Sequence, residues 1–253
     1  MNFAGRIADA AAEYPDAIAI QELGPSGVRS TTYTQLLADA ARWRGHFTRE
    51  GIQAGDRVAI LGKNSESWIA AYLGVLGLGA VAVPLDTAYR DDQVQTVVAD
   101  AGAKLLVRVP VVPDVPVVPD VPVVPVVPVV PVVPDSPAVI LYTSGTTADP
   151  KGVVLTHANL DAERAGVLTV IDCRPGDALL GVLPLFHALA QMANLLVPLS
   201  VGARVVFLED INSTSLVSAL QERGITIFVC VPQFFYLIHQ RVMRSEEHTS
   251  ELQ

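Results

Sequence analysis

Apolar residues recur along this chain with two different spacings. Between residues 34 and 47 they follow one face of a helix, and the run ends near Gly51, so we expect a helix that Thr34 caps. Shorter apolar runs bounded by Gly, Pro and polar residues predict strands. Strands are expected at 57–61, 80–84, 138–142 and 226–231, and a helix at 65–79. Residues 183–187 are expected to close a further strand and to open an apolar helix that runs to residue 199.

The alternation of strands and helices predicts an α/β fold with layered, mainly parallel sheets and flanking helices. The chain has 253 residues, of which 51% are hydrophobic, so it can bury a sizeable core. An uncharged run at 69–85 is long enough to raise the question of a membrane span. Its glycines and Pro84 divide it into helix, turn and strand, which favours a buried unit of the fold.

Charge and cysteine content narrow the classes of function. The net charge of −9 argues against a nucleic-acid-binding protein, which needs clustered Lys and Arg. Cys173 and Cys230 lie far apart without neighbouring ligands, so we expect neither a zinc site nor a disulfide framework. The first residues lack the apolar core of a signal peptide. These observations favour a reduced, cytoplasmic setting and no metal site built by the chain.

One stretch carries the most chemistry, Tyr-Thr-Ser-Gly-Thr-Thr-Ala-Asp-Pro-Lys-Gly-Val at 142–153. Small residues let backbone N–H groups approach a phosphate, hydroxyls rotate to donate, and Lys151 adds a mobile cation. The stretch lies between two apolar runs, and Thr156 is expected to cap the next helix. It is not the common P-loop, because Lys151 precedes Gly152. A flexible turn without a ligand is the alternative reading.

This stretch resembles the phosphate-binding signature of the adenylate-forming synthetases, which include acyl-CoA synthetases, luciferases and peptide-synthetase adenylation domains. Ala148 departs from the pattern, since the family usually has Gly there. If the backbone at this position needs positive φ, Ala weakens the binding of the phosphates. The resemblance implies that ATP phosphates are held by Thr143, Ser144, Gly145, Thr146, Thr147 and Lys151.

Other segments are similar to the same family. Residues 32–37 and 79–86 match its early Tyr-Thr-x-x-Leu and Gly-Ala-x-x-x-Pro-Leu-Asp elements, which are mostly packing elements. His187 ends a Pro-Leu-x-His motif that lies on the acyl side in acyl-CoA synthetases, although a core histidine is the plainer reading. A Val-Pro turn beside the acyl pocket implies contacts from Pro232, Gln233 and Phe234, with an aromatic core cluster as the alternative.

The resemblance, strongest to fatty-acid–CoA ligases, implies an enzyme that activates a carboxylic acid with ATP and Mg²⁺ as an acyl-adenylate. The acyl group then passes to coenzyme A. The expected partners are these small molecules, with neither nucleic acid nor a membrane-spanning segment; peripheral contact with a membrane stays open for an enzyme of fatty acids. The rival hypothesis is a non-catalytic α/β scaffold that displays a proline-rich repeat.

We divide the chain at 1–108, 109–137, 138–243 and 244–253. The first and third segments form one interrupted N-terminal adenylation domain. Between them lies a Pro-Val repeat, which we expect to be a mobile, extended linker. The alternatives are a Pro-x-x-Pro ligand for an SH3-like partner, and an expanded repeat or a sequence assembly error over one. The last segment resembles a translated sequencing adapter. Because no later family elements follow, the isolated fragment is expected to be inactive.

Overall fold

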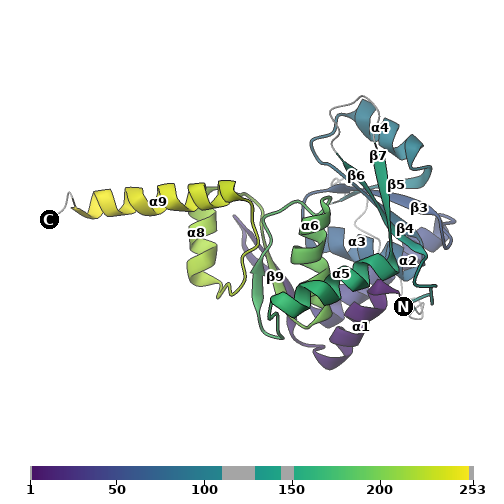
Figure 1. The fold of residues 1–253 in the computed structure, drawn as a ribbon, viewed down its shortest axis with the longest axis horizontal. Coiled ribbons are helices and arrows are strands. Elements are labelled where there is room, and N and C mark those ends of the chain that lie inside the picture. The colour runs from purple at the N-terminus through teal and green to yellow at the C-terminus, as the bar shows by residue number, and fades with distance from the viewer. Residues whose placement is uncertain (1, 110–128, 144–150, 251–253) are drawn as a thin grey trace.

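The fold is seen in a computed structural model that describes residues 2–109, 129–143 and 151–250. It contains two sheets with helices between and around them (Figure 1). The first sheet has the strand order β2-β1-β9-β8, formed by β1 Ile18–Gly24, β2 Gly27–Thr32, β8 Ala178–Leu180 and β9 Arg204–Leu208. The second has the order β5-β3-β4-β6-β7, formed by β3 Arg57–Gly62, β4 Val81–Leu85, β5 Ala103–Val109, β6 Pro137–Thr143 and β7 Lys151–Thr156.

The helices connect these strands and pack on their faces. They are α1 Phe3–Glu13, α2 Tyr33–Arg49, α3 Glu66–Gly77, α4 Asp91–Asp100, α5 His157–Val170, α6 Ala188–Gln191, α7 Val197–Ser200, α8 Ser213–Glu222 and α9 Pro232–Ser250. A π-helical segment, η1 Met192–Leu196, joins α6 to α7. Pro198 has no N–H to donate to the carbonyl four residues earlier, which explains why the helical ladder shifts here.

The inner strands of each sheet are buried on both faces, whereas the edge strands β2 and β7 are largely exposed. In β3, Val58 and Ile60 join the central core with α2 and α3, whereas Ala59 joins a separate core with α4 on the opposite face. In β9, Val205 joins the central core, and Val206 packs outward with α8. Strands buried on both faces are typical of parallel α/β sheets. The layers therefore run from α8 and α9 through the first sheet, the central helices and the second sheet to α4.

The predicted fold class is confirmed. Strands β3, β4, β5 and β6 pair in parallel, as do β1, β8 and β9, while β2 and β7 are antiparallel additions. The uncharged run at 69–85 forms α3 and β4 inside the core, as predicted. Gly79 ends α3 at a φ of 69°, and the N–H of Ala80 donates to the Val75 carbonyl over 3.2 Å. This is the Schellman arrangement that favours glycine.

The predicted cap of α2 was wrong by two residues. Thr32 caps the helix: its hydroxyl accepts from the Gln35 N–H, and the Gln35 side chain accepts from the Thr32 N–H. The hydroxyl of Thr34 instead donates to the carbonyl of Pro15 over 2.9 Å. The reciprocal bonds of a capping box satisfy two helix donors at once, which explains the choice of Thr32. The predicted cap at Thr156 is confirmed.

The strand predicted at 226–231 is reduced to a single parallel bridge between Ile227 and Leu179. The edge available to it is short, because β8 ends at Leu180 and the N–H of Val182 folds back to the Leu180 carbonyl over 3.3 Å. A strand needs a row of partner groups, and this edge supplies only a few. Because β8 ends at Leu180, residues 183–187 lie beyond the strand that we expected them to close, and this prediction was wrong.

Part of the Pro-Val repeat can be followed in the structure. Residues 110–128 lie outside the described residues, so the expected mobility there stays a prediction. The described end contacts the fold: the N–H of Val130 donates to the Gly77 carbonyl over 2.9 Å, and Asn2 Nδ2 donates to the Val130 carbonyl over 3.1 Å. The last residues of the repeat are thereby fixed against the end of α3.

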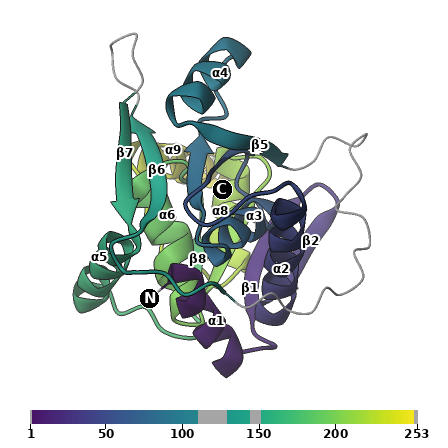
Figure 2. The same ribbon diagram turned by 90° about the vertical axis from the view of Figure 1, so that its right-hand side faces the viewer.

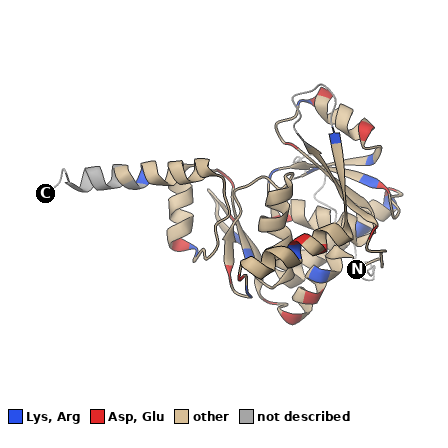
Figure 3. Ribbon diagram, in the orientation of Figure 1, with Lys and Arg blue, Asp and Glu red and all other residues tan. Residues whose placement is uncertain are grey.

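Charged side chains of both signs are interspersed over the peripheral helices, and the strands between them are largely uncharged (Figure 3). Helix α9 extends away from the two sheets and contacts α8 (Figure 1). Within the described part of the chain, no helix has both the length and the apolar character to cross a membrane.

The contact of α2 with α3 predicts a sensitive glycine. A Cβ on Gly74 would lie 2.7 Å from Trp43 Cβ and 3.2 Å from the Ala40 carbonyl. Gly74→Ala should therefore lower the free energy of unfolding by about 1–3 kcal/mol, measured by urea denaturation. Gly166→Ala is the matched control, because nothing lies within 4 Å of its Cβ position on exposed α5. A stability loss in the control equal to that of Gly74→Ala would contradict the packing explanation.

Candidate functional site

The predicted phosphate loop connects the two strands of a hairpin at the edge of the second sheet. Strand β6 lies beside β7 (Figure 2). It pairs in parallel with β4 and antiparallel with β7, and Thr143 is the register partner of Lys151. The loop between them, which holds Ser144, Gly145, Thr146, Thr147 and Ala148, lies outside the described residues. Lys151 is exposed at the first position of β7. The strands predicted on either side of the signature are confirmed, while the phosphate contacts stay a prediction.

His187 occupies the N-cap position of α6 and is exposed. Its backbone N–H donates to the Pro184 carbonyl over 3.1 Å, and its carbonyl accepts from the Gln191 N–H over 3.0 Å. The imidazole lies against the ring of Phe186, with 4.2 Å between the ring centroids. His187 is therefore not a core histidine, which was the alternative that the sequence left open.

Pro232, Gln233 and Phe234 form the first turn of α9, where we expected a non-helical turn. Pro232 and Gln233 are exposed, whereas Phe234 is half-buried in the apolar layer beneath the first sheet. Its ring centroid lies 6.5 Å from that of Phe228 in an edge-to-face arrangement. The proline explains the helix start, because its fixed φ suits the first helical position. Proximity of these residues to an acyl group stays a prediction.

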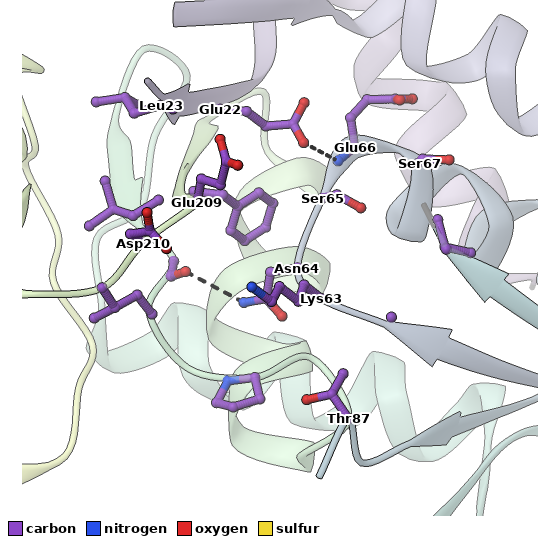
Figure 4. Close-up of a pocket in the computed structure, with 18 of the residues that line it drawn as sticks. Glu22, Leu23, Lys63, Asn64, Ser65, Glu66, Ser67, Thr87, Glu209 and Asp210 are labelled. Atoms are coloured by element: carbon purple, nitrogen blue, oxygen red, sulfur yellow. Dashed lines mark hydrogen bonds between the residues drawn. The ribbon is translucent and has the colours of Figure 1, made fainter. Parts of the chain in front are cut away.

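A cleft of about 1350 Å³ opens where the carboxyl ends of strands from both sheets converge (Figure 4). The second sheet contributes the ends of β3 and β5, including Lys63 and Arg108. The first sheet contributes the ends of β1 and β9, including Glu22, Glu209 and Asp210. Charged groups of both signs therefore line a space between apolar layers.

The topology explains why the cleft lies at this edge. Strand β3 connects through α3 to β4 on one side, and β4 connects through α4 to β5 on the other side of β3. The chain direction across the sheet therefore reverses between β3 and β5. In open α/β sheets, such a reversal leaves a crevice at the carboxyl ends of the strands, where ligands usually bind.

Sequence reasoning missed Asn64, which lies two residues after the end of β3. Its Nδ2 donates to the Leu183 carbonyl over 2.8 Å, and its Oδ1 accepts from the Leu185 N–H over 2.9 Å. The amide thus holds the segment that leads to His187 against the end of the second sheet. A polar amide two residues after a buried apolar strand, followed by the α3 cap Ser65, is the signal that could have indicated it.

Carboxylates interact at one end of the cleft. Glu22 accepts from Arg29 Nε over 2.8 Å, and its other oxygen accepts from the Glu66 backbone N–H over 3.2 Å (Figure 4). Burial, reinforced by the carboxylates of Asp39 and Glu22, raises the pKa of Glu66 to about 7. Glu66 Oε1 is buried without a hydrogen-bond partner in the described part of the chain. The Glu66 carboxyl is therefore poised to titrate near neutral pH.

The cleft is not lined by the predicted site residues that the structure describes. Among the described ones, Thr143, Lys151, His187 and Phe234 are not in its lining, whereas Pro184 and Phe186 of the acyl-side motif are. The motif therefore reaches from the cleft wall at Phe186 to the exposed start of α6 at His187.

A sequence profile described as "AMP-binding enzyme" matches residues 7–253. The chain belongs to this family. A long-chain-fatty-acid–CoA ligase, FadD13 of Mycobacterium tuberculosis, is 30% identical over 238 residues, which cover 85% of this chain and 47% of that enzyme. A feruloyl-CoA synthase of Amycolatopsis is also 30% identical, over 88% of this chain and 47% of its own length. The chain thus spans about half the length of the curated relatives it matches.

Solved structures of the AMP-binding family confirm the fold. The inhibitor-bound N-terminal domain of FACL13 from Mycobacterium tuberculosis aligns with a TM-score of 0.81 and 28% identity, over 93% of this chain and 67% of that one. A fatty acyl-CoA synthetase of the same organism aligns with a TM-score of 0.82 and 27% identity, over 94% of this chain and 51% of its own. The layers described above are therefore those of an adenylate-forming N-terminal domain.

The bonds of Asn64 predict a loss of stability in variants. Asn64→Ala removes both bonds and leaves the Leu185 N–H and the Leu183 carbonyl unpaired, so the free energy of unfolding should fall by about 1–3 kcal/mol. Thermal unfolding followed by circular dichroism measures this. Ser67→Ala, a small change on the same side of the cleft, is the control and should stay near the wild type. Equal stabilities for all three proteins would contradict the proposed clamp.

The raised pKa of Glu66 predicts a pH dependence of stability. Between its ordinary value of 4.5 and about 7, the folded protein binds this proton more tightly than the unfolded chain does. The Glu66 contribution to the free energy of unfolding should therefore fall as pH rises through this window, with a slope of up to about 1.4 kcal/mol per pH unit. Glu66→Gln should remove this part of the slope in urea denaturation from pH 4.5 to 8. An unchanged slope would refute the assignment to Glu66.

Proposed function

We propose that this chain is part of an ATP-dependent acyl-CoA synthetase. The whole enzyme activates a carboxylic acid as an acyl-adenylate with release of pyrophosphate, and transfers the acyl group to the thiol of coenzyme A. The observation that carries the proposal is the hairpin of β6 and β7, which brings Lys151 opposite Thr143 at the two ends of the phosphate signature. Membership in the AMP-binding enzyme family supports it.

The hairpin offers suitable chemistry for the pyrophosphate. In the proposed reaction a carboxylate oxygen attacks the α-phosphorus, the bond from that phosphorus to the bridging oxygen breaks, and pyrophosphate leaves with the electron pair. Negative charge on phosphate oxygens is stabilised by N–H groups, hydroxyls and ammonium groups that are held in place beforehand. Thr143, Ser144, Gly145, Thr146, Thr147 and Lys151 are the proposed set. Mg²⁺ would accompany the ATP phosphates, and we assign it no ligands, since no group of three or more acidic, His or Cys residues in the described ranges could hold a metal.

A fatty acid is the proposed acid. The apolar helical segment after His187, formed by α6, η1 and α7, supports this by its resemblance to fatty-acid–CoA ligases, while most of its own apolar side chains are buried in the core. Curated relatives carry the names of long-chain-fatty-acid–CoA ligase, feruloyl-CoA synthase and 2-succinylbenzoate–CoA ligase. A panel of fatty, aromatic and dicarboxylic acids in carboxylate-dependent ATP–pyrophosphate exchange distinguishes these classes. Preference of the full-length protein for an aromatic acid would overturn the fatty-acid assignment.

Lys151 should matter for phosphate binding without mattering for stability. Lys151→Ala should weaken binding of pyrophosphate to the purified chain by roughly tenfold or more, because an ammonium group paired with a phosphate is lost. Isothermal titration calorimetry measures the affinity. Lys104→Ala, which removes a cation from the distant strand β5, is the control and should bind as the wild type does. Equal affinities for both variants would contradict the phosphate site.

Position 148 supplies a second test. Ala148→Gly restores the residue that the resemblance leads us to expect, and in the full-length enzyme it should lower the ATP KM by up to roughly tenfold if Ala costs about 1 kcal/mol there. Steady-state exchange kinetics measure the change. An unchanged or raised KM would show that the backbone at this position accommodates Ala without strain.

A further inference from the structure

Tyr142 joins the hairpin to the outer helix of the second sheet. It lies on β6 beside Thr143, and only 9% of its surface is exposed. Its hydroxyl donates to Asp100 Oδ2 over 2.6 Å, at the last position of α4. Asp100 itself is exposed, and a hydroxyl that donates to a carboxylate still makes one of the stronger hydrogen bonds in proteins. The bond therefore ties β6 firmly to α4.

The ring of Tyr142 also covers the neighbouring strand. Tyr142 is the register partner of Gly152, the residue after Lys151. A Cβ on Gly152 would lie 3.0 Å from Tyr142 Cζ, 3.2 Å from its hydroxyl and 2.9 Å from Ile140 Cγ2. Gly152 has an ordinary backbone, so the requirement for glycine here comes from this close approach. The ring thus lies across the start of β7.

These contacts form a continuous connection from α4 to Lys151. Asp100 holds the hydroxyl, the hydroxyl fixes the ring, and the ring packs on Gly152. Burial and the Asp100 carboxylate both raise the pKa of Tyr142 above its ordinary value, so the hydroxyl keeps its proton at neutral pH. Lys151 itself has a long exposed side chain. A fixed backbone at its base reduces the conformational entropy that the lysine loses when it binds an anion.

We propose that Asp100, Tyr142 and Gly152 are positioning residues that hold the backbone of Lys151 in place, so that its side chain can bind a phosphate group. The proposal rests on the proposed function, since it needs Lys151 to bind phosphate. It adds residues outside the phosphate signature, because Asp100 belongs to a helix 42 residues earlier in the chain.

Pyrophosphate binding to the 253-residue chain, measured by isothermal titration calorimetry, is the first test. Tyr142→Phe, Asp100→Ala and Gly152→Ala should each weaken binding by roughly five- to tenfold. Tyr142→Phe combined with Asp100→Ala should be no weaker than either alone, because both remove the same bond. Asp100→Asn keeps an acceptor and should restore binding to within about twofold. Asp92→Asn changes a carboxylate on the same helix that accepts from Arg90, so this variant should bind as the wild type does.

Amide hydrogen exchange of residues 151–156 without ligand is the second test. Exchange should be faster in Tyr142→Phe and Asp100→Ala than in the wild type and in Asp92→Asn. Unchanged exchange would overturn the positioning role, as would wild-type pyrophosphate affinity in Tyr142→Phe. If the wild-type chain binds no pyrophosphate, the phosphate site proposed above fails, and the exchange data alone then decide whether these residues order the base of Lys151.

Discussion

The central layer of helices, buried between two sheets, is the constraint on which the rest of this structure depends. Helices α2 and α3 cover one face of each sheet, while α8 covers the other face of the first sheet and α4 that of the second. The inner strands of both sheets are therefore apolar on two faces. Two-sided burial favours parallel strands joined by helical crossovers. Parallel strands place their carboxyl ends at a common edge, and the reversal of direction between β3 and β5 opens the cleft there.

The polar groups at this edge follow from the same constraint. Where the strands end, backbone and side-chain groups lose their ladder partners and have to find others. Asn64 meets this need across the two sheets, and its amide bonds hold the segment before His187. The shielding that helps this clamp also makes charge costly, which is why the Glu66 carboxyl holds its proton to a higher pH than usual. The strength of the Asn64 hydrogen bonds and the raised pKa of Glu66 therefore have the same cause, which is the shielding of this edge from water.

The hairpin of β6 and β7 departs from the parallel pattern, and it carries the family signature. An antiparallel edge strand can be reached through a short loop, whereas a parallel strand needs a long crossover. The short connection returns the chain within a few residues, so both ends of the signature lie side by side. A single edge strand is weakly held, and the Tyr142 contacts with Asp100 and Gly152 supply additional anchoring. Membership in the AMP-binding enzyme family agrees with this arrangement.

The sequence by itself determined the element types, the fold class and the family, because apolar spacing, Gly and Pro positions and one local signature are all local properties of the chain. The helix at α2, the buried pair of α3 and β4, and the cap at Thr156 followed from such signals. The tertiary structure alone decided the roles of Asn64, Asp100 and Gly152. Each acts through a partner that the fold brings from elsewhere, whether the segment from Leu183 to Leu185 or a ring on a facing strand. Residues 226–231 show the same limit, since their apolar pattern suits a strand but only a short β8 edge was there to pair with them.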